Sequence, residues 1–139
     1  GERAQPLPRL RPARRVRGMT PTQNARLTLA IGLVVVLGWF GIDKFLHPLN
    51  WIGWMPDWMD GLGGISTNTW LLAIGAFEAL LALGLCIVWK NIQHWTALLA
   101  SLHLTSVVLA VGWNDIGIRD IGLTCAASAL WYLSKPTKK

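Results

Sequence analysis

Long apolar stretches, separated by short polar connections, constrain this chain more than any other feature. Four of them, each about 20 residues long, cover residues 27–46, 69–89, 92–113 and 116–133. A helix of that length crosses the hydrocarbon core of a bilayer, which is about 30 Å thick. Only 14% of the 139 residues are charged, against about a quarter in a soluble domain. The sequence therefore predicts an all-α fold, an integral membrane bundle of four transmembrane helices within residues 25–135.

Basic residues divide the predicted connections into two sets. Seven arginines precede the first span, Lys90 follows the second, and three lysines follow the fourth. On the opposite side, only Lys44 and Arg119 accompany five aspartates. Cytoplasmic connections are enriched in Lys and Arg. The distribution predicts a multi-pass protein of the plasma membrane with both termini in the cytoplasm, and the lipid bilayer as its main partner.

The first 24 residues form a basic tail with four prolines and a single acid, Glu2. Such a segment cannot bury enough apolar surface to become ordered, so residues 1–24 are predicted to be disordered. Met19 is a plausible native start, which leaves residues 1–18 in question. A basic tail can indicate nucleic acid, but no nucleic-acid-binding module follows it, and no nucleic-acid partner is expected.

The connection between the first two spans is rich in tryptophan and methionine. Its apolar positions 51, 54, 55, 58, 59 and 62 fall on one helical face, while Pro56 prevents one continuous helix. We expect a broken helical element lying on the membrane surface. Apart from Trp39, which lies within the first span, the other tryptophans fall near the ends of the predicted spans, where an apolar ring with a polar N–H is most favourable.

Two ionisable residues lie deep within predicted spans. Glu78 is in the second span and His103 is in the third, both about 13 Å below the outer surface. Because these spans form a hairpin, the two side chains are expected to face each other. The pair is the candidate catalytic or proton-relaying site. A purely structural hydrogen bond between the helices remains the alternative.

A second polar set gathers at the outer ends of the first and fourth spans. Two interpretations are open: interfacial snorkelling with helix capping by Asn114 or Asp115, or a polar mouth leading inward to Glu78 and His103. The set consists of Asp43, Lys44, His47, Asn114, Asp115, Arg119 and Asp120.

The remaining potential ligands are scattered. His94 is expected at the surface of the third span. Cys86 and Cys125 are predicted to lie at different depths, about 25 Å and about 13 Å from the outer face, too far apart for a disulfide. No metal-binding motif such as HExxH or repeated ExxH is present, so no metal site is expected.

Several short segments together resemble the DoxX-like family of small four-helix membrane proteins, which is related to a DoxD-type quinone oxidoreductase subunit. The segments are Gly41-Ile-Asp-Lys44-Phe45, Phe77-Glu78, Asn114-Asp115 and Arg119-Asp120-Ile121-Gly122-Leu123. The resemblance covers residues 27–134. It implies a redox association, a possible quinone cofactor and other membrane redox subunits as partners. The chain is short and has no second soluble domain, so thiosulfate chemistry is not carried over.

By this resemblance, Lys44, Glu78, Arg119 and Asp120 match positions at which the family carries charge. With His103 they form the candidate cofactor-binding set.

Three functions remain open, and whether the protein is an enzyme is left undecided. The leading hypothesis is a small redox-associated subunit that contacts quinone, which predicts an apolar pocket reaching Glu78 and His103. A non-catalytic scaffold or assembly subunit predicts that these groups are closed off by pairing with each other. A pathway for protons or a small solute predicts a polar route from both sides, although the inner half of the predicted bundle offers few polar residues.

Overall fold

The computed structural model describes residues 18–87 and 89–136, and within them the only regular elements are helices. Three of the four long helices are long and apolar enough to cross a membrane: α1 (Pro21–Leu46), α3 (Thr67–Cys86) and α4 (Lys90–Val111). The fourth, α5 (Asp115–Leu133), is less apolar, because Asp115, Arg119 and Asp120 fall in its first two turns. The all-helical, membrane-type character predicted from the sequence is thus confirmed.

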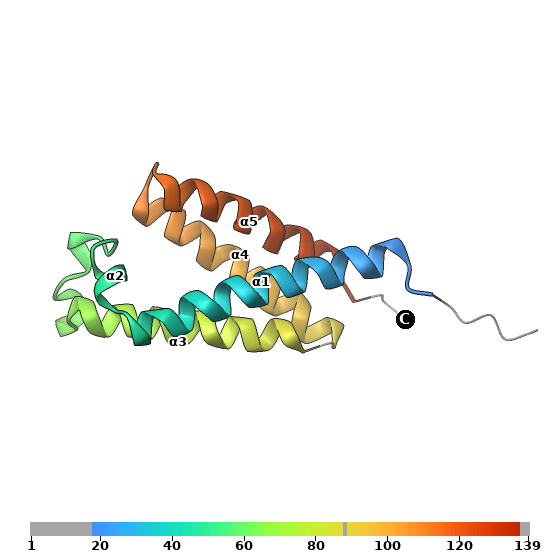
Figure 1. Ribbon diagram of the computed structural model, residues 1–139, viewed down its shortest axis with the longest axis horizontal. Coiled ribbons are helices and arrows are strands. Elements are labelled where there is room, and N and C mark those ends of the chain that lie inside the picture. Colours follow the sequence, from blue (N-terminus) through green and yellow to red (C-terminus); the bar gives the residue numbers. More distant parts are fainter. Residues whose placement is uncertain (1–17, 88, 137–139) are drawn as a thin grey trace, which may run out of the picture.

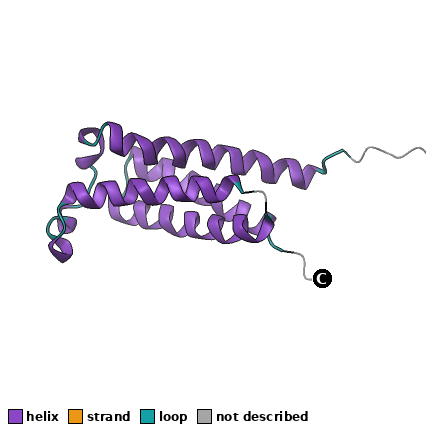
Figure 2. Ribbon diagram, turned by 90° about the horizontal axis from the view of Figure 1, so that it is seen from below, coloured by secondary structure: helices purple, strands orange, loops and turns teal. Residues whose placement is uncertain are grey.

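The long helices form two pairs that pack against each other (Figure 1). Helix α1 lies along α3, and α4 lies along α5, with smaller contacts from α3 to α4 and from α1 to α5. The start of α1, the turn between α3 and α4, and the end of α5 lie together at what we call the terminal end (Figures 1 and 2). The connection between α1 and α3 occupies the opposite end, called the loop end.

Helix α1 begins earlier than the sequence analysis predicted. Thr20 and Gln23 form a capping box, in which each side chain bonds the backbone N–H of the other residue, and Pro21 occupies the first helical position. Both features are standard helix-start signals. The prediction of disorder up to residue 24 was therefore wrong for Pro21–Asn24. The rest of the predicted tail, residues 1–17, lies outside the described residues.

The turn between α3 and α4 also differs from the prediction. Helix α3 ends at Cys86 rather than at residue 89, and Lys90 is the first residue of α4 rather than part of the turn. Ile87 and Trp89 have extended backbone angles. A β-branched residue such as Ile87 favours that conformation over a further helical turn. The predicted fourth span, by contrast, agrees with α5 to within one residue.

Small residues set the closest helix contacts. Between α1 and α3, a Cβ added to Gly41 would lie 2.7 Å from the carbonyl oxygen of Gly75, so the two backbones touch there. Between α4 and α5, the core includes the fully buried Ala97, Ala100 and Ala127. Close approach of this kind is typical of helix packing in membranes. It brings the helix turns that follow Gly41 and Gly75 into side-chain contact.

Candidate functional site

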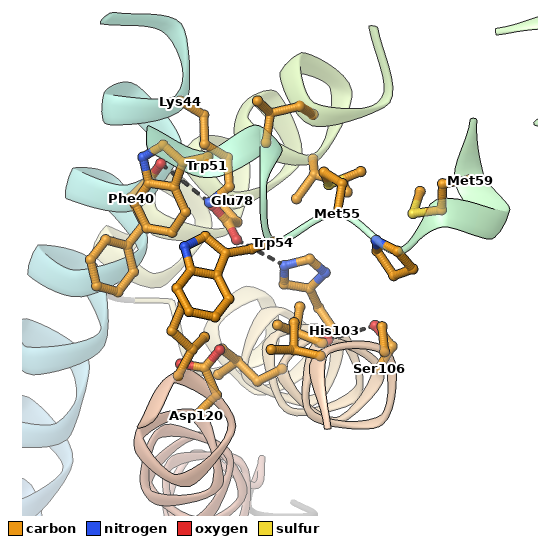
Figure 3. Close-up of a pocket in the computed structure, with 18 of the residues that line it drawn as sticks. Phe40, Lys44, Trp51, Trp54, Met55, Met59, Glu78, His103, Ser106 and Asp120 are labelled. Carbon is orange, nitrogen blue, oxygen red and sulfur yellow. Dashed lines mark hydrogen bonds and ion pairs between the residues drawn. The ribbon is translucent and has the colours of Figure 1, made fainter. Parts of the chain in front are cut away.

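Three ionisable side chains from three helices meet near the loop end (Figure 3). Lys44 Nζ of α1 lies 2.5 Å from Glu78 Oε2 of α3, and His103 Nε2 of α4 lies 3.2 Å from Glu78 Oε1. The three side chains are only 7%, 8% and 10% exposed, respectively. The predicted contact of Glu78 with His103 is confirmed, and the carboxylate bridges both basic groups.

The snorkelling interpretation predicted that Lys44 extends toward the membrane surface. Instead, its side chain points into the bundle. Lys44 follows Leu33, Leu37 and Gly41 on the buried face of α1, one helical turn beyond the contact with Gly75. Its ammonium group also donates to the carbonyl oxygen of Phe40, at 3.4 Å, and lies 4.2 Å from the centroid of the Trp51 ring. Pairing, hydrogen bonding and a cation–π contact together reduce the cost of burying this charge.

A second ion pair lies on α5. Arg119 Nε donates to Asp120 Oδ1 at 2.8 Å, and the Asp120 side chain is only 4% exposed. The Arg119 guanidinium carbon lies 4.3 Å from the centroid of the Phe40 ring. Phe40 therefore links α1 to α5 through a cation–π contact. The sequence analysis did not single out Phe40, although its position one turn before Lys44 was a usable signal.

All five predicted cofactor-binding residues line one cavity of about 270 Å³. Lys44, Glu78, His103, Arg119 and Asp120 supply its ionisable groups, and Ser106 adds a hydroxyl group. The rest of the lining is almost entirely apolar and includes Leu37, Phe40, Leu71, Ile74, Leu104, Val107, Ala110, Val111 and Ile116. The structure thus joins the midplane pair and the Arg119–Asp120 pair into a single site.

The connection between α1 and α3 covers this cavity. It contains α2 (Leu49–Ile52), the 3₁₀ turns η1 (Asp57–Met59) and η2 (Leu62–Gly64), and Pro56 just before η1. The predicted break at Pro56 is therefore confirmed. The side chains of this connection that line the cavity are Trp51, Trp54, Met55, Pro56, Trp58 and Met59. Figure 3 shows Trp51, Trp54, Met55 and Met59 among them. The position of the connection on the membrane surface stays a prediction.

Asp43 anchors this cover to α1. Its two carboxylate oxygens accept from Trp51 Nε1 and contact His47 Nδ1, both at 2.8 Å. Asp43 and His47 therefore hold the loop rather than line the cavity. Asn114 caps α5 by accepting from the N–H groups of Ile116 and Gly117, as one of the two capping assignments predicted. These three residues have structural roles outside the cavity.

His94 is buried, and the prediction of a surface position was wrong. Trp131 Nε1 donates to His94 Nε2 at 3.0 Å, while His94 Nδ1 lies 2.9 Å from the carbonyl oxygen of Trp131. The two rings are stacked. His94 shares the buried face of α4 with Ala97 and Ala100, and that spacing would have placed it inward.

Neither the cysteines nor any metal-ligand cluster adds to the site. Cys86 and Cys125 are both free and exposed. Over residues 18–87 and 89–136, no group of three His, Cys, Asp or Glu side chains is arranged to hold a metal ion. No family model, curated protein or solved structure matches this chain.

Proposed function

We propose that this chain is a DoxX-like integral membrane protein, a small redox-associated subunit that binds the ring of a quinone in the cavity at the loop end. The observation that carries the proposal is an apolar cavity with buried charged groups at its base. The quinone hypothesis predicted a pocket reaching Glu78 and His103, and both residues line this one.

The residues present suit such a ring. The cavity, about 270 Å³, is slightly smaller than the roughly 300–1,000 Å³ typical of small-molecule sites, which matches a single ring better than a large polar cofactor. Tryptophan and methionine side chains offer faces against which a flat ring packs. A quinone supplies two-electron, two-proton redox chemistry, with its electrons coming from a partner redox subunit.

The polar groups have distinct roles in this proposal. Lys44 and His103 are positioned to donate hydrogen bonds to a carbonyl oxygen at the base of the cavity. His103 Nδ1 makes no hydrogen bond within the described part of the chain, so a donor or acceptor remains for a ligand. Glu78, between the two basic groups, keeps a proton acceptor next to the site.

The proposal includes four spans and a cytoplasmic position for both termini in the plasma membrane. Helix α5 packs along α4 and has 19 residues, about 28 Å of helix. The terminal end carries Arg26, Lys90 and Lys135, as the positive-inside rule requires of a cytoplasmic face. A reporter fused after Lys139 should show a cytoplasmic location. A reporter inserted between Trp51 and Asp60 should show an external location. The opposite pattern would reverse the orientation.

Glu78→Gln tests the quinone site, because it keeps the side-chain shape and removes the charge. The variant should insert but melt at a lower temperature, because the buried Lys44 loses its carboxylate partner, and it should lose retention of a quinone analogue and activity in a deletion strain. Asp115→Asn is the matched control, since Asp115 is exposed at the same end and does not line the cavity. Wild-type quinone retention and activity in Glu78→Gln would refute the proposal.

A scaffold or assembly subunit is the second candidate, and one observation favours it. Every fully buried side-chain nitrogen and oxygen in the described residues already has a hydrogen-bond partner, so none of these atoms requires a ligand. If the wild type retains no quinone while Glu78→Gln lowers the yield of a partner complex, the scaffold function holds.

A continuous pathway is disfavoured, because Leu33, Leu81 and Ala100 form a closely packed apolar layer below the cavity.

A further inference from the structure

A second, larger cavity lies at the terminal end, on the side of the bundle where α1 begins. It has a volume of about 650 Å³ and is bounded by the first half of α1, the end of α3 and the start of α4. Its polar residues, Gln23, Arg26, Lys90 and Gln93, all belong to the first turns of α1 and α4. The apolar remainder continues along α1 toward the middle of the bundle: Leu27, Ala30, Ile31, Val34 and Val35.

The two cations of this groove have no acidic partner among the described residues. Neither Arg26 nor Lys90 takes part in an ion pair there. The carboxylates of the described residues all belong to the second half of α1, the connection after it, the middle of α3 or the start of α5: Asp43, Asp57, Asp60, Glu78, Asp115 and Asp120. The groove is therefore a positively charged pocket whose charge is not neutralised by those residues.

The start of α4 adds to this positive character. Its N-cap residue, Trp89, makes no side-chain hydrogen bond to the first turn. The helix N-terminus carries unpaired N–H groups and a partial positive charge. Lys90 is the first residue of that turn, so a fixed charge and the helix dipole act at the same place.

We infer that this groove binds an anionic phospholipid. The phosphate would lie between Arg26 and Lys90 at the mouth, and an acyl chain would follow Leu27, Ile31 and Val34 toward the bilayer centre. A polar, cationic mouth continuing into an apolar channel matches the chemistry of such a lipid, and basic pockets between membrane helices bind anionic headgroups. The inference needs only a membrane-embedded bundle and is independent of the quinone proposal.

Native mass spectrometry of the full-length protein in neutral detergent, with added phosphatidylglycerol or phosphatidylcholine, tests the inference. The wild type should retain phosphatidylglycerol in preference to phosphatidylcholine. Arg26→Gln with Lys90→Gln should weaken phosphatidylglycerol binding by about 30-fold, the effect of two headgroup attractions. Lys135→Gln is the matched control, because it removes a cation near the terminal end without changing the groove. Equal retention of the two lipids, or equal loss in Lys135→Gln, would overturn the inference.

Cysteine alkylation gives a second readout that needs no substitution. Cys86 lines the groove and Cys125 does not, yet both are exposed. Phosphatidylglycerol should slow the reaction of Cys86 with a maleimide several-fold and leave Cys125 unchanged. Equal slowing at both thiols, or no slowing at Cys86, would contradict a lipid in the groove. Inorganic phosphate should protect neither thiol, and protection of Cys86 by phosphate alone would instead indicate a small-anion site.

Discussion

Helix α4 carries two histidines, one buried and one largely buried, whose neighbours differ. His103 contacts a carboxylate that also binds Lys44, and it borders a cavity. His94 has both ring nitrogens engaged with Trp131, and it lines neither of the two cavities described above. Burial and hydrogen bonding are common to both, so neither property marks a functional group. The difference lies in a charged partner and an adjoining space that a ligand can occupy.

The same contrast extends to the two ends of the bundle. Near the loop end, buried polar groups form ion pairs around a covered cavity. Toward the terminal end the polar pairs between helices are neutral: the buried Ser134 donates to Gln93, and the part-buried Ser101 and Ser128 bond each other in the middle of the bundle. Neutral pairs hold helices together without the desolvation cost of a charge. The buried charged groups, which carry the largest desolvation cost, therefore lie beside the cavity that a ligand can occupy.

Lys44→Met should produce the largest effect, because it leaves the buried Glu78 without its closest cation. Removing one partner of a buried ion pair costs about 3–5 kcal/mol. Denaturant unfolding in detergent measures the loss, and Lys44→Met combined with Glu78→Gln should recover much of it. A double variant no more stable than the single one would show that the pair is not the source of the instability.

Gly41→Ala should reduce stability by about 1–3 kcal/mol, since the new methyl group meets the backbone of α3. It would separate α1 from α3 next to the Lys44–Glu78 pair. Gly32→Ala is the control, because the same helix has open space around Gly32. Melting curves of the two variants measure the difference, and similar curves would contradict a tight α1–α3 contact.

Replacing each histidine of α4 by glutamine in turn distinguishes the role of His94 from that of His103. His94→Gln should lower stability by about 1 kcal/mol through partial loss of the Trp131 contacts, with quinone binding unchanged. His103→Gln should weaken quinone binding by about tenfold, the value of one hydrogen bond, with a smaller change in stability. Titration of a quinone analogue beside thermal unfolding tests both. The reverse assignment would show that the cavity is not the ligand site.

The smallest expected effect is at the cover of the cavity. Trp54→Ala should weaken binding of a quinone analogue by about three- to tenfold, because one aromatic contact is lost, while stability stays close to that of the wild type. Trp113→Ala is the control, since Trp113 is 85% exposed and does not line the cavity. Equal binding in both variants would mean that the cover does not contact the ligand.

Much of the fold was readable from the residues. Hydropathy placed the long helices, Asn114 marked the start of α5, and the hairpin geometry brought Glu78 opposite His103. The capping box of Thr20 and Gln23 is an equally local signal, and it marks the start of α1 at Pro21, earlier than hydropathy alone indicates. Helix length, hydropathy and capping depend on residues that are close in the sequence, so they can be predicted without knowledge of the tertiary structure.

Only the tertiary structure decided which way the side chains face. Depth along a helix follows from counting residues, but rotation about its axis does not when both the core and the lipid are apolar, because the helix then has no polar face to mark its exterior. His94 was therefore placed at a surface, and the direction of Lys44 was left open between the interface and the interior, although packing turns both inward. The folding of the Trp51–Met59 segment over the cavity, and the gathering of all five candidate residues around it, depend on contacts between helices distant in sequence.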